Sequence, residues 1–336
     1  MARRTGYCGY SQPPRRRLMT SPLLAVQHES LALEGPKVVA LGGGHGLAIT
    51  LKAVQSYAAE ITAVVAVADD GGSSGRLTGA LGIPPPGDIR RCLLALTPDD
   101  SLWSELFAFR FAGGDIADHS LGNLLLAALT EIIGDFGGAV DAAGRILRTV
   151  GRVVPVANEP AELRAMAEGR EIVGQAEITK TRGIESMSLG PDHIKANPAA
   201  LAAIAEADQV ILGPGSLFTS LLAVVMVPGI AEAWHKSQAR RVFVLNLIDQ
   251  DGETMGMSGA DHLQILAAMG GVGGPGVVVV HTGELPVPVE HQLVTVDPDT
   301  ALAWGWDVAP GNVIDEDADW PAHDPAKLRR ALQPYV

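Results

Sequence analysis

The chain has 336 residues, of which 47% are hydrophobic and 19% charged, and this composition excludes an acidic disordered chain and a fibrous protein. Its 25 Lys and Arg residues stand against 38 Asp and Glu residues, a formal net charge of −13. A chain this acidic has no global electrostatic attraction to DNA, RNA or anionic lipid. We therefore expect no nucleic-acid partner, and any bound phosphate must be held locally.

The composition along the chain predicts one central domain with an extension at each end. Residues 1–35 contain five arginines and several prolines without sustained periodicity, which predicts a disordered arm. Residues 36–297 are predicted to form a nucleotide-binding α/β domain, and the acidic residues 298–336 an extension that packs on it. The longest apolar runs fall far short of the roughly 20 residues that span a bilayer, so we expect no membrane span and a cytoplasmic location.

In chain order, the first apolar run, Lys37–Leu41, predicts a strand, Leu47–Tyr57 a helix and Ile61–Ala68 a second strand. Further strands are predicted at Val153–Ala157, Val210–Leu212, Val242–Leu247 and Val277–His281, with helices at Leu121–Ile133, Pro198–Glu206, Ala260–Met269 and Lys327–Leu332. Continuous Val, Ile and Leu runs are typical of parallel strands that are covered on both faces. The sequence therefore predicts a doubly wound, mainly parallel α/β sheet of the Rossmann type.

Residues 171–195 break this rhythm. The segment Glu171–Thr179 alternates between apolar and polar residues, and a polar stretch with a glycine follows it. This pattern predicts a strand over Glu171–Thr179 and a small antiparallel insertion.

The first candidate site is a glycine-rich turn between the first strand and the first helix, formed by Gly42, Gly43, Gly44, His45 and Gly46. Glycines let the backbone approach a ligand closely, and the free N–H groups of a helix N-terminus bind phosphate. The third glycine of the dinucleotide-binding fingerprint is replaced by Leu47, so a plain tight turn stays an alternative.

The second candidate follows the next strand and comprises Asp69, Asp70, Gly71, Gly72, Ser73, Ser74 and Arg76. A carboxylate here suits a ribose hydroxyl, and two adjacent carboxylates suit Mg²⁺ between phosphates. The two serines and their N–H groups are expected to form an anion nest with Arg76. A serine nucleophile is disfavoured, because Gly79, Gly82 and a triple proline make a stable helix after Gly75 doubtful.

Four further segments supply candidate groups. Asp88 is either the N-cap of the next helix or a ligand contact. His119 and Asn123 open a helix and present donors, although a structural role for the histidine is the alternative. A second glycine-rich turn contains Gly213, Pro214, Gly215 and Ser216, with Ser216 as a helix cap, and residues 246–254 either line the same crevice or form a solvated loop. Two such turns at the carboxyl ends of parallel strands favour a diphosphate between them.

The motifs Gly42–Gly46, Ala68–Leu77, Pro85–Ile89, His119–Glu131 and Leu212–Ser220 stand in the order seen in the YvcK/GlmR, or gluconeogenesis factor, family. The chain resembles this family from about Val38 to Thr254 and His262, and more weakly to His323. The resemblance implies a fold shared with 2-phospho-L-lactate transferase (CofD). It also implies a cytoplasmic bacterial protein that binds UDP-N-acetylglucosamine (UDP-GlcNAc) at Gly42–Gly46 and Asp69–Arg76, with no established reaction.

The leading interpretation is a UDP-GlcNAc-binding regulator of cell-wall precursor supply, carbon allocation and cell shape, with no catalytic turnover and no required cofactor. A cell-wall synthesis enzyme is the expected protein partner, and a homo-oligomer is left open. The alternative is a CofD-like, Mg²⁺-dependent phosphotransferase that uses a nucleoside-diphosphate-linked donor, with Mg²⁺ held by Asp69 or Asp70. Departures from the family pattern at Ala223, Val224 and Asp251 leave the nucleotide open.

Overall fold

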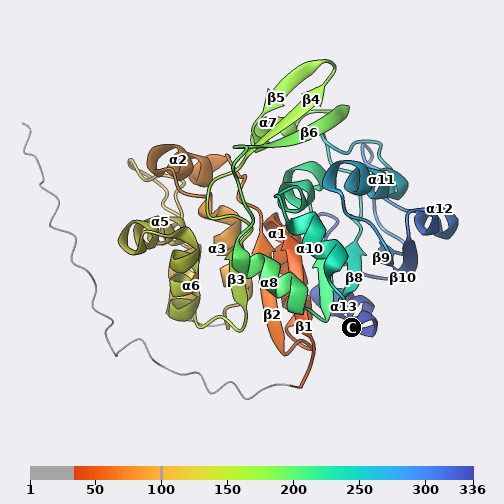
Figure 1. Ribbon diagram of the computed structural model, residues 1–336, viewed down its shortest axis with the longest axis horizontal. Coiled ribbons are helices and arrows are strands. Elements are labelled where there is room, and N and C mark those ends of the chain that lie inside the picture. The colour runs from red at the N-terminus through yellow and green to blue at the C-terminus, as the bar shows by residue number, and fades with distance from the viewer. Residues whose placement is uncertain (1–33, 99–100) are drawn as a thin grey trace, which may run out of the picture. The chain divides into compact units, whose positions relative to one another are not determined.

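The computed structural model describes residues 34–98 and 101–336 (Figure 1). The arm predicted for residues 1–35 lies outside the described residues, apart from its last two positions.

Seven parallel strands form the central sheet in the order β10-β9-β8-β7-β1-β2-β3 (Figure 1). In the register of this sheet, Val39 of the central strand pairs with Thr62 on one side and Val210 on the other. The strands are β1 (Lys37–Gly42), β2 (Glu60–Val65), β3 (Arg152–Pro155), β7 (Gln209–Leu212), β8 (Arg240–Val244), β9 (Gly276–His281) and β10 (Trp306–Gly311). The prediction of a doubly wound parallel α/β fold is confirmed.

Helices cover both faces of this sheet because alternate side chains of each strand enter two separate hydrophobic clusters. Val39 and Leu41 of β1 belong to one cluster, and Val38 and Ala40 belong to the other. The first cluster includes residues of α8 (Pro198–Glu206), α10 (Ile230–Lys236) and α11 (Gly259–Gly270), and the second includes residues of α1 (Gly44–Val54), α3 (Pro86–Ala95), α6 (Phe136–Leu147) and α13 (Pro325–Leu332). Each fully buried aliphatic side chain contributes about 1.5 to 3 kcal/mol to folding.

The remaining elements of the described chain connect these layers. They are α2 (Gly72–Leu81), α4 (Leu102–Ala108), α5 (Leu121–Ile133), the π-helix η2 (Leu217–Leu222), α9 (Ala223–Val225), α12 (Pro298–Ala303) and the short 3₁₀ helix η3 (Gln333–Tyr335). The doubt about a stable helix after the Asp69–Asp70 loop is wrong, since α2 forms there. It ends at Gly82, which adopts the left-handed conformation (φ 67°) that a glycine accepts without strain.

A three-stranded antiparallel sheet, in the order β5-β4-β6, forms the insertion and stands above the central sheet in Figure 1. Its elements are β4 (Glu162–Ala167), β5 (Arg170–Val173), α7 (Gln175–Ile178) and β6 (Ile184–Gly190). The antiparallel insertion is confirmed, but the prediction of one strand over Glu171–Thr179 is wrong. The strand ends at Val173, and the Asp70 carboxylate accepts a hydrogen bond from the Ala176 N–H (2.9 Å) in the first turn of α7.

The C-terminal segment is part of the main sheet. Its strand β10 pairs with β9, and the sequence pattern did not predict this strand. The chain end is fixed by the buried side chain of Gln209 in β7, whose Nε2 donates to the carbonyl oxygens of Leu332 and Tyr335 (2.9 Å each).

Within residues 34–98 and 101–336, no single helix is long and apolar enough to cross a membrane. The pair Leu217–Val225 and Ile230–Lys236 meets the length and apolarity requirements only together, with a bend of 72° between its two parts.

Two glycines of α2 give a matched test of how tightly the preceding loop packs on this helix. A Cβ at Gly75 would lie 1.9 Å from the backbone oxygen of Asp70, whereas a Cβ at Gly79 would have no neighbour within 4 Å. We expect Gly75→Ala to lower the unfolding free energy by about 1 to 3 kcal/mol through overpacking. Gly79→Ala should raise it by about 0.5 to 1 kcal/mol through helix propensity. Urea denaturation of both variants measures this difference, and equal effects would contradict the packing.

Candidate functional site

A cavity of about 760 Å³ opens where the loops after β1, β7 and β8 meet. These strands are neighbours in the sheet, and the chain reverses its direction of winding between β1 and β7, which is where doubly wound folds bind ligands. The described lining residues are His45, Gly46, Ile49, Pro214, Gly215, residues 246–251, His291 and residues 320–323. Of the predicted site residues, His45, Gly46, Pro214 and Gly215 line the cavity, and the prediction that residues 246–254 reach the same crevice is confirmed for residues 246–251.

The two glycine-rich turns pack against each other at the base of this cavity. A Cβ at Gly46 would lie 2.2 Å from the carbonyl oxygen of Pro214, so only glycine fits there. The buried Thr50 hydroxyl donates to the carbonyl oxygens of Gly213 (3.0 Å) and Gly46 (3.2 Å). The glycines therefore serve close backbone packing between α1 and the second turn.

In the first turn, the N–H of Gly44 is already occupied by a carboxylate of the chain itself. It donates to Oδ2 of Asp88 (2.7 Å), and the other oxygen of Asp88 pairs with Arg91. The prediction of Asp88 as an N-cap is wrong, because Pro85 holds that position and Asp88 lies in the first turn of α3. The first N–H groups of a helix have no acceptor within the helix. The N–H groups of His45 and Gly46, which come next in α1, are therefore candidates to bind an anion.

The donors of the second turn are also paired within the chain. Asn246 accepts from the Gly215 N–H (3.0 Å) and donates to the Gly215 carbonyl oxygen (2.9 Å). Ser216 stands at the N-cap position of η2, as predicted, but its hydroxyl accepts no capping hydrogen bond from the helix backbone and donates to Oε1 of Glu253. Thr219 donates to Oε2 of the same carboxylate (3.2 Å).

Glu253 is a buried carboxyl whose ionisation is disfavoured. Burial raises its pKa to about 7, although hydrogen bonds from Ser216, Thr219 and the N–H of Leu217 act in the opposite direction. The side chain thus closes the N-terminus of η2, which is where the sequence predicted a ligand phosphate.

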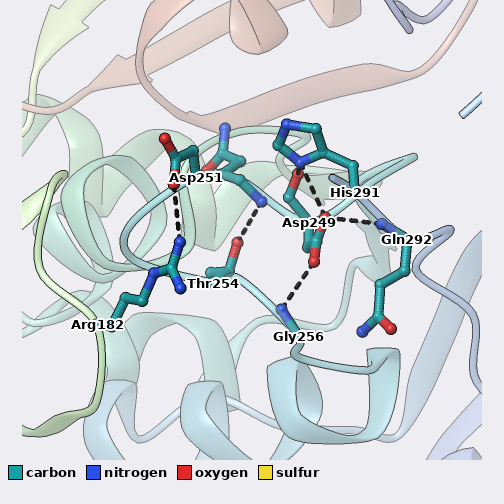
Figure 2. A network of polar contacts seen from close by, with 8 residues as sticks. Arg182, Asp249, Asp251, Thr254, Gly256, His291 and Gln292 are labelled. Atoms are coloured by element: carbon teal, nitrogen blue, oxygen red, sulfur yellow. Dashed lines mark hydrogen bonds and ion pairs between the residues drawn. The ribbon is translucent and has the colours of Figure 1, made fainter. Parts of the chain in front are cut away.

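A network around Asp249 fixes one wall of the cavity (Figure 2). One carboxylate oxygen accepts from the Gln292 N–H (3.0 Å) and from Nδ1 of His291 (3.1 Å), and the other accepts from the Gly256 N–H (2.7 Å). Burial opposes the ionisation of Asp249, but these hydrogen bonds outweigh it and lower the pKa. Because the carboxylate only accepts, the proton of this hydrogen bond lies on Nδ1 of His291, which leaves Nε2 outside the contact with Asp249.

Aromatic and ionic groups complete the rim. Trp320 is 54% exposed and meets the His291 ring edge to face at 5.3 Å. Asp251 pairs with Arg182 of the insertion (3.3 Å), as Figure 2 shows. His323 is buried, its Nε2 has no hydrogen-bond partner among the described residues, and burial lowers its pKa to about 4, so the ring is neutral at physiological pH.

Three of the predicted residues form a separate buried network between α2 and α5. Ser73 Oγ lies 2.8 Å from Nδ1 of His119 and accepts from Nδ2 of Asn123 (3.0 Å). Asn123 in turn accepts from Nε of Arg90 (3.1 Å). None of the three lines the cavity of about 760 Å³, so the structure divides the predicted site into two groups of residues.

The neighbouring side chains of Asp69 and Asp70 also contact different parts of the chain. Asp69 Oδ1 accepts from the Gly71 N–H (3.0 Å), and burial raises the Asp69 pKa, whereas Asp70 holds α7. Arg76 donates to the Ala117 carbonyl oxygen (2.6 Å), and no hydrogen bond joins it to Ser73 or Ser74 in the described structure. Ser74 instead accepts from the Gly87 N–H (3.1 Å).

These contacts do not fit a magnesium site built by Asp69 and Asp70 together. The two carboxylates bind different backbone segments, and no group of three or more His, Cys, Asp or Glu side chains within the described ranges is placed to hold a metal ion. Magnesium brought in by a nucleotide stays a prediction.

The sequence analysis missed His291, Trp320 and His323 as cavity residues. They come from irregular segments after β9 and β10, where no hydrophobic period places a side chain. The one available pointer was His323, which stands at the weak end of the family resemblance.

Residues 38–312 match the protein family described as 2-phospho-L-lactate transferase CofD. The chain belongs to the CofD family. The gluconeogenesis factor of Bacillus subtilis is 39% identical over 307 residues, which cover 88% of this chain and 97% of that protein. The gluconeogenesis factor of Halalkalibacterium halodurans is 39% identical over 305 residues, covering 88% and 95%. A crystal structure of a Bacillus halodurans protein has a TM-score of 0.84 at 37% identity, covering 89% of this chain and 100% of that chain. The resemblance to the gluconeogenesis factors is confirmed.

The raised pKa of Glu253 predicts a pH-dependent stability of this CofD-family chain. Between the ordinary value of 4.5 and about 7, the folded state keeps a proton that the unfolded state releases. The contribution of Glu253 to the unfolding free energy therefore falls as the pH rises through this window, by about 3 kcal/mol. Urea denaturation below and above the window should show that the wild type loses about this much stability relative to Glu253→Gln, because other groups such as His323 titrate alike in both proteins. The exposed Glu105→Gln serves as the control and should behave as the wild type; a parallel pH dependence in all three proteins would contradict the assignment.

Proposed function

We propose that this chain binds UDP-GlcNAc in the cavity of about 760 Å³ and acts as a regulator of cell-wall precursor supply, carbon allocation and cell shape. The observation that carries the proposal is the meeting of the β1, β7 and β8 loops in one cavity at the switch point of the sheet. The volume lies within the range of small-molecule sites, about 300 to 1,000 Å³. The family membership and the gluconeogenesis factor relatives support a shared role.

The lining chemistry suits the parts of a nucleotide sugar. Trp320 offers an aromatic face to a base, and the exposed Asp251 is an acceptor for a sugar hydroxyl. The N–H groups of His45 and Gly46 at the start of α1 suit the diphosphate. Since Asp88 and Glu253 already fill the neighbouring donors, affinity rests on these remaining groups.

A regulator acts through a partner, and we place a cell-wall synthesis enzyme in that role. Self-association of the chain would be compatible with this regulatory role.

One observation favours the second candidate, a Mg²⁺-dependent phosphotransferase with a nucleoside-diphosphate-linked donor. The Asp249 carboxylate orients His291 through Nδ1 and leaves Nε2 free, which is the arrangement of a general base. Such a base would remove a proton from an acceptor hydroxyl, while a metal with the nucleotide would neutralise phosphate charge.

Two tryptophans give a matched test of binding. Trp320 lines the cavity and Trp304, 38% exposed, does not. Because an aromatic face contributes about 1 to 3 kcal/mol to holding a base, Trp320→Ala should weaken UDP-GlcNAc about tenfold in calorimetry. Trp304→Ala should bind as the wild type. Equal affinity of both variants and the wild type would place the nucleotide elsewhere.

The absence of turnover is tested by long incubation of the purified chain with UDP-GlcNAc, with and without Mg²⁺, followed by chromatography of free UMP and UDP. We expect intact UDP-GlcNAc in both samples, because a regulator needs only binding. Sustained release of UMP that disappears in His291→Gln would contradict the regulator and support the phosphotransferase, because transfer of the sugar phosphate breaks the bond between the two phosphates and leaves UMP.

A further inference from the structure

A second cavity, of about 490 Å³, lies beside α1 and α3 and is strongly cationic. Its described lining residues are His45, Ala48, Lys52, Arg90, Arg91, Leu94, Ala95 and Arg110. None of these lining residues is acidic, in a chain whose net charge is −13. Like charges repel when they are gathered in a partly buried space, so this concentration of cations needs a compensating anion.

Arg90 is the buried centre of this cluster. The residue is 8% exposed, and its Nε donates to Asn123, a neutral amide. A Cβ at Gly122 would lie 2.7 Å from Cδ of Arg90, so the glycine makes room for the side chain. Within the described chain Arg90 forms no ion pair with a carboxylate. A buried charge without a partner is costly, and the guanidinium is held in place by groups that do not neutralise it.

The neighbouring carboxylate is committed elsewhere. Asp88 pairs with Arg91 through one oxygen and accepts from the Gly44 N–H through the other. Burial, together with Arg91 and Arg110, lowers the pKa of Arg90 to about 10. Burial and Arg91 also lower the pKa of His45. Burial is the larger cause of both shifts, and the neighbouring arginines act in the same direction while Asp88 opposes them.

We propose that this cavity binds the phosphate monoester of a small metabolite as a second ligand, separate from the nucleotide. A phosphate dianion matches the fork of donors that arginine presents, and the arginines here have donors free of ion pairs. The cavity is larger than a phosphate ion, and Ala48, Leu94 and Ala95 provide an apolar wall for an organic body. His45 lines both cavities, so the two ligands would lie next to each other.

Titration calorimetry on the full chain tests the site with three probes: glucose 6-phosphate, inorganic phosphate and glucose. We expect glucose 6-phosphate to bind more tightly than inorganic phosphate, and glucose not to bind. Loss of an exposed cation from the cluster, in Lys52→Gln or Arg110→Gln, should weaken glucose 6-phosphate about fivefold to tenfold. The exposed Arg145→Gln on α6, outside both cavities, should bind as the wild type, and thermal unfolding confirms that each variant is folded.

The result is independent of whether UDP-GlcNAc binds, because the probes are titrated first into the free chain. Absence of glucose 6-phosphate binding, or binding that is unchanged in Lys52→Gln and Arg110→Gln, would overturn the proposal. Equal affinity for inorganic phosphate would overturn the ester as the ligand class. If UDP-GlcNAc binds, we expect glucose 6-phosphate to bind to the saturated complex as well. Competition between the two, with both weakened alike in Arg110→Gln, would assign the cavity to the nucleotide phosphates and overturn a separate site.

Discussion

The arrangement of both cavities depends on one partly buried interaction, the contact of the Asp88 carboxylate with the N–H of Gly44 and with Arg91. A buried carboxylate is tolerated only when it is paired or hydrogen-bonded, so this contact ties the start of α1 to α3. His45 directly follows Gly44 and is thereby set between the two cavities. The same carboxylate occupies the position that a ligand phosphate would take at the first N–H of α1.

The second glycine-rich turn follows the same physical rule. Free N–H groups at a helix N-terminus need an acceptor, and the chain supplies Asn246 for Gly215 and Glu253 for the start of η2. Glycine at these turns therefore allows two backbones to touch, as Gly46 and Pro214 do, in addition to any approach of a ligand. The side chains that line the cavity come partly from loops that follow other strands, among them His291 and Trp320.

The local pattern of apolar residues predicted the helices and strands whose side chains face a hydrophobic core. Leu121–Ile133 and Pro198–Glu206 have the predicted bounds, because both are rich in apolar helix-forming residues and a capping residue, Ser120 or Asn197, marks the start of each. The edge strand Trp306–Gly311 escaped prediction, since only Trp306 and Ala309 are buried and it contains proline and glycine. The segment Glu171–Thr179 was predicted as one strand because its alternation continues past Val173, while a tertiary hydrogen bond from Ala176 to Asp70 favours a helical turn.

The sequence by itself determined the parallel sheet, apart from its edge strand Trp306–Gly311, and the two glycine-rich turns. A strand with a continuous apolar run is buried on both faces of a sheet, and clustered glycines favour tight turns. Both features can therefore be predicted from the local sequence. Tertiary structure decided that Asp88 and Glu253 fill the N–H groups of those turns, and that Arg90 and Arg110 meet Lys52 around a second cavity. These contacts join side chains that lie far apart in the chain and meet only once the layers have packed. No local sequence pattern therefore predicts them.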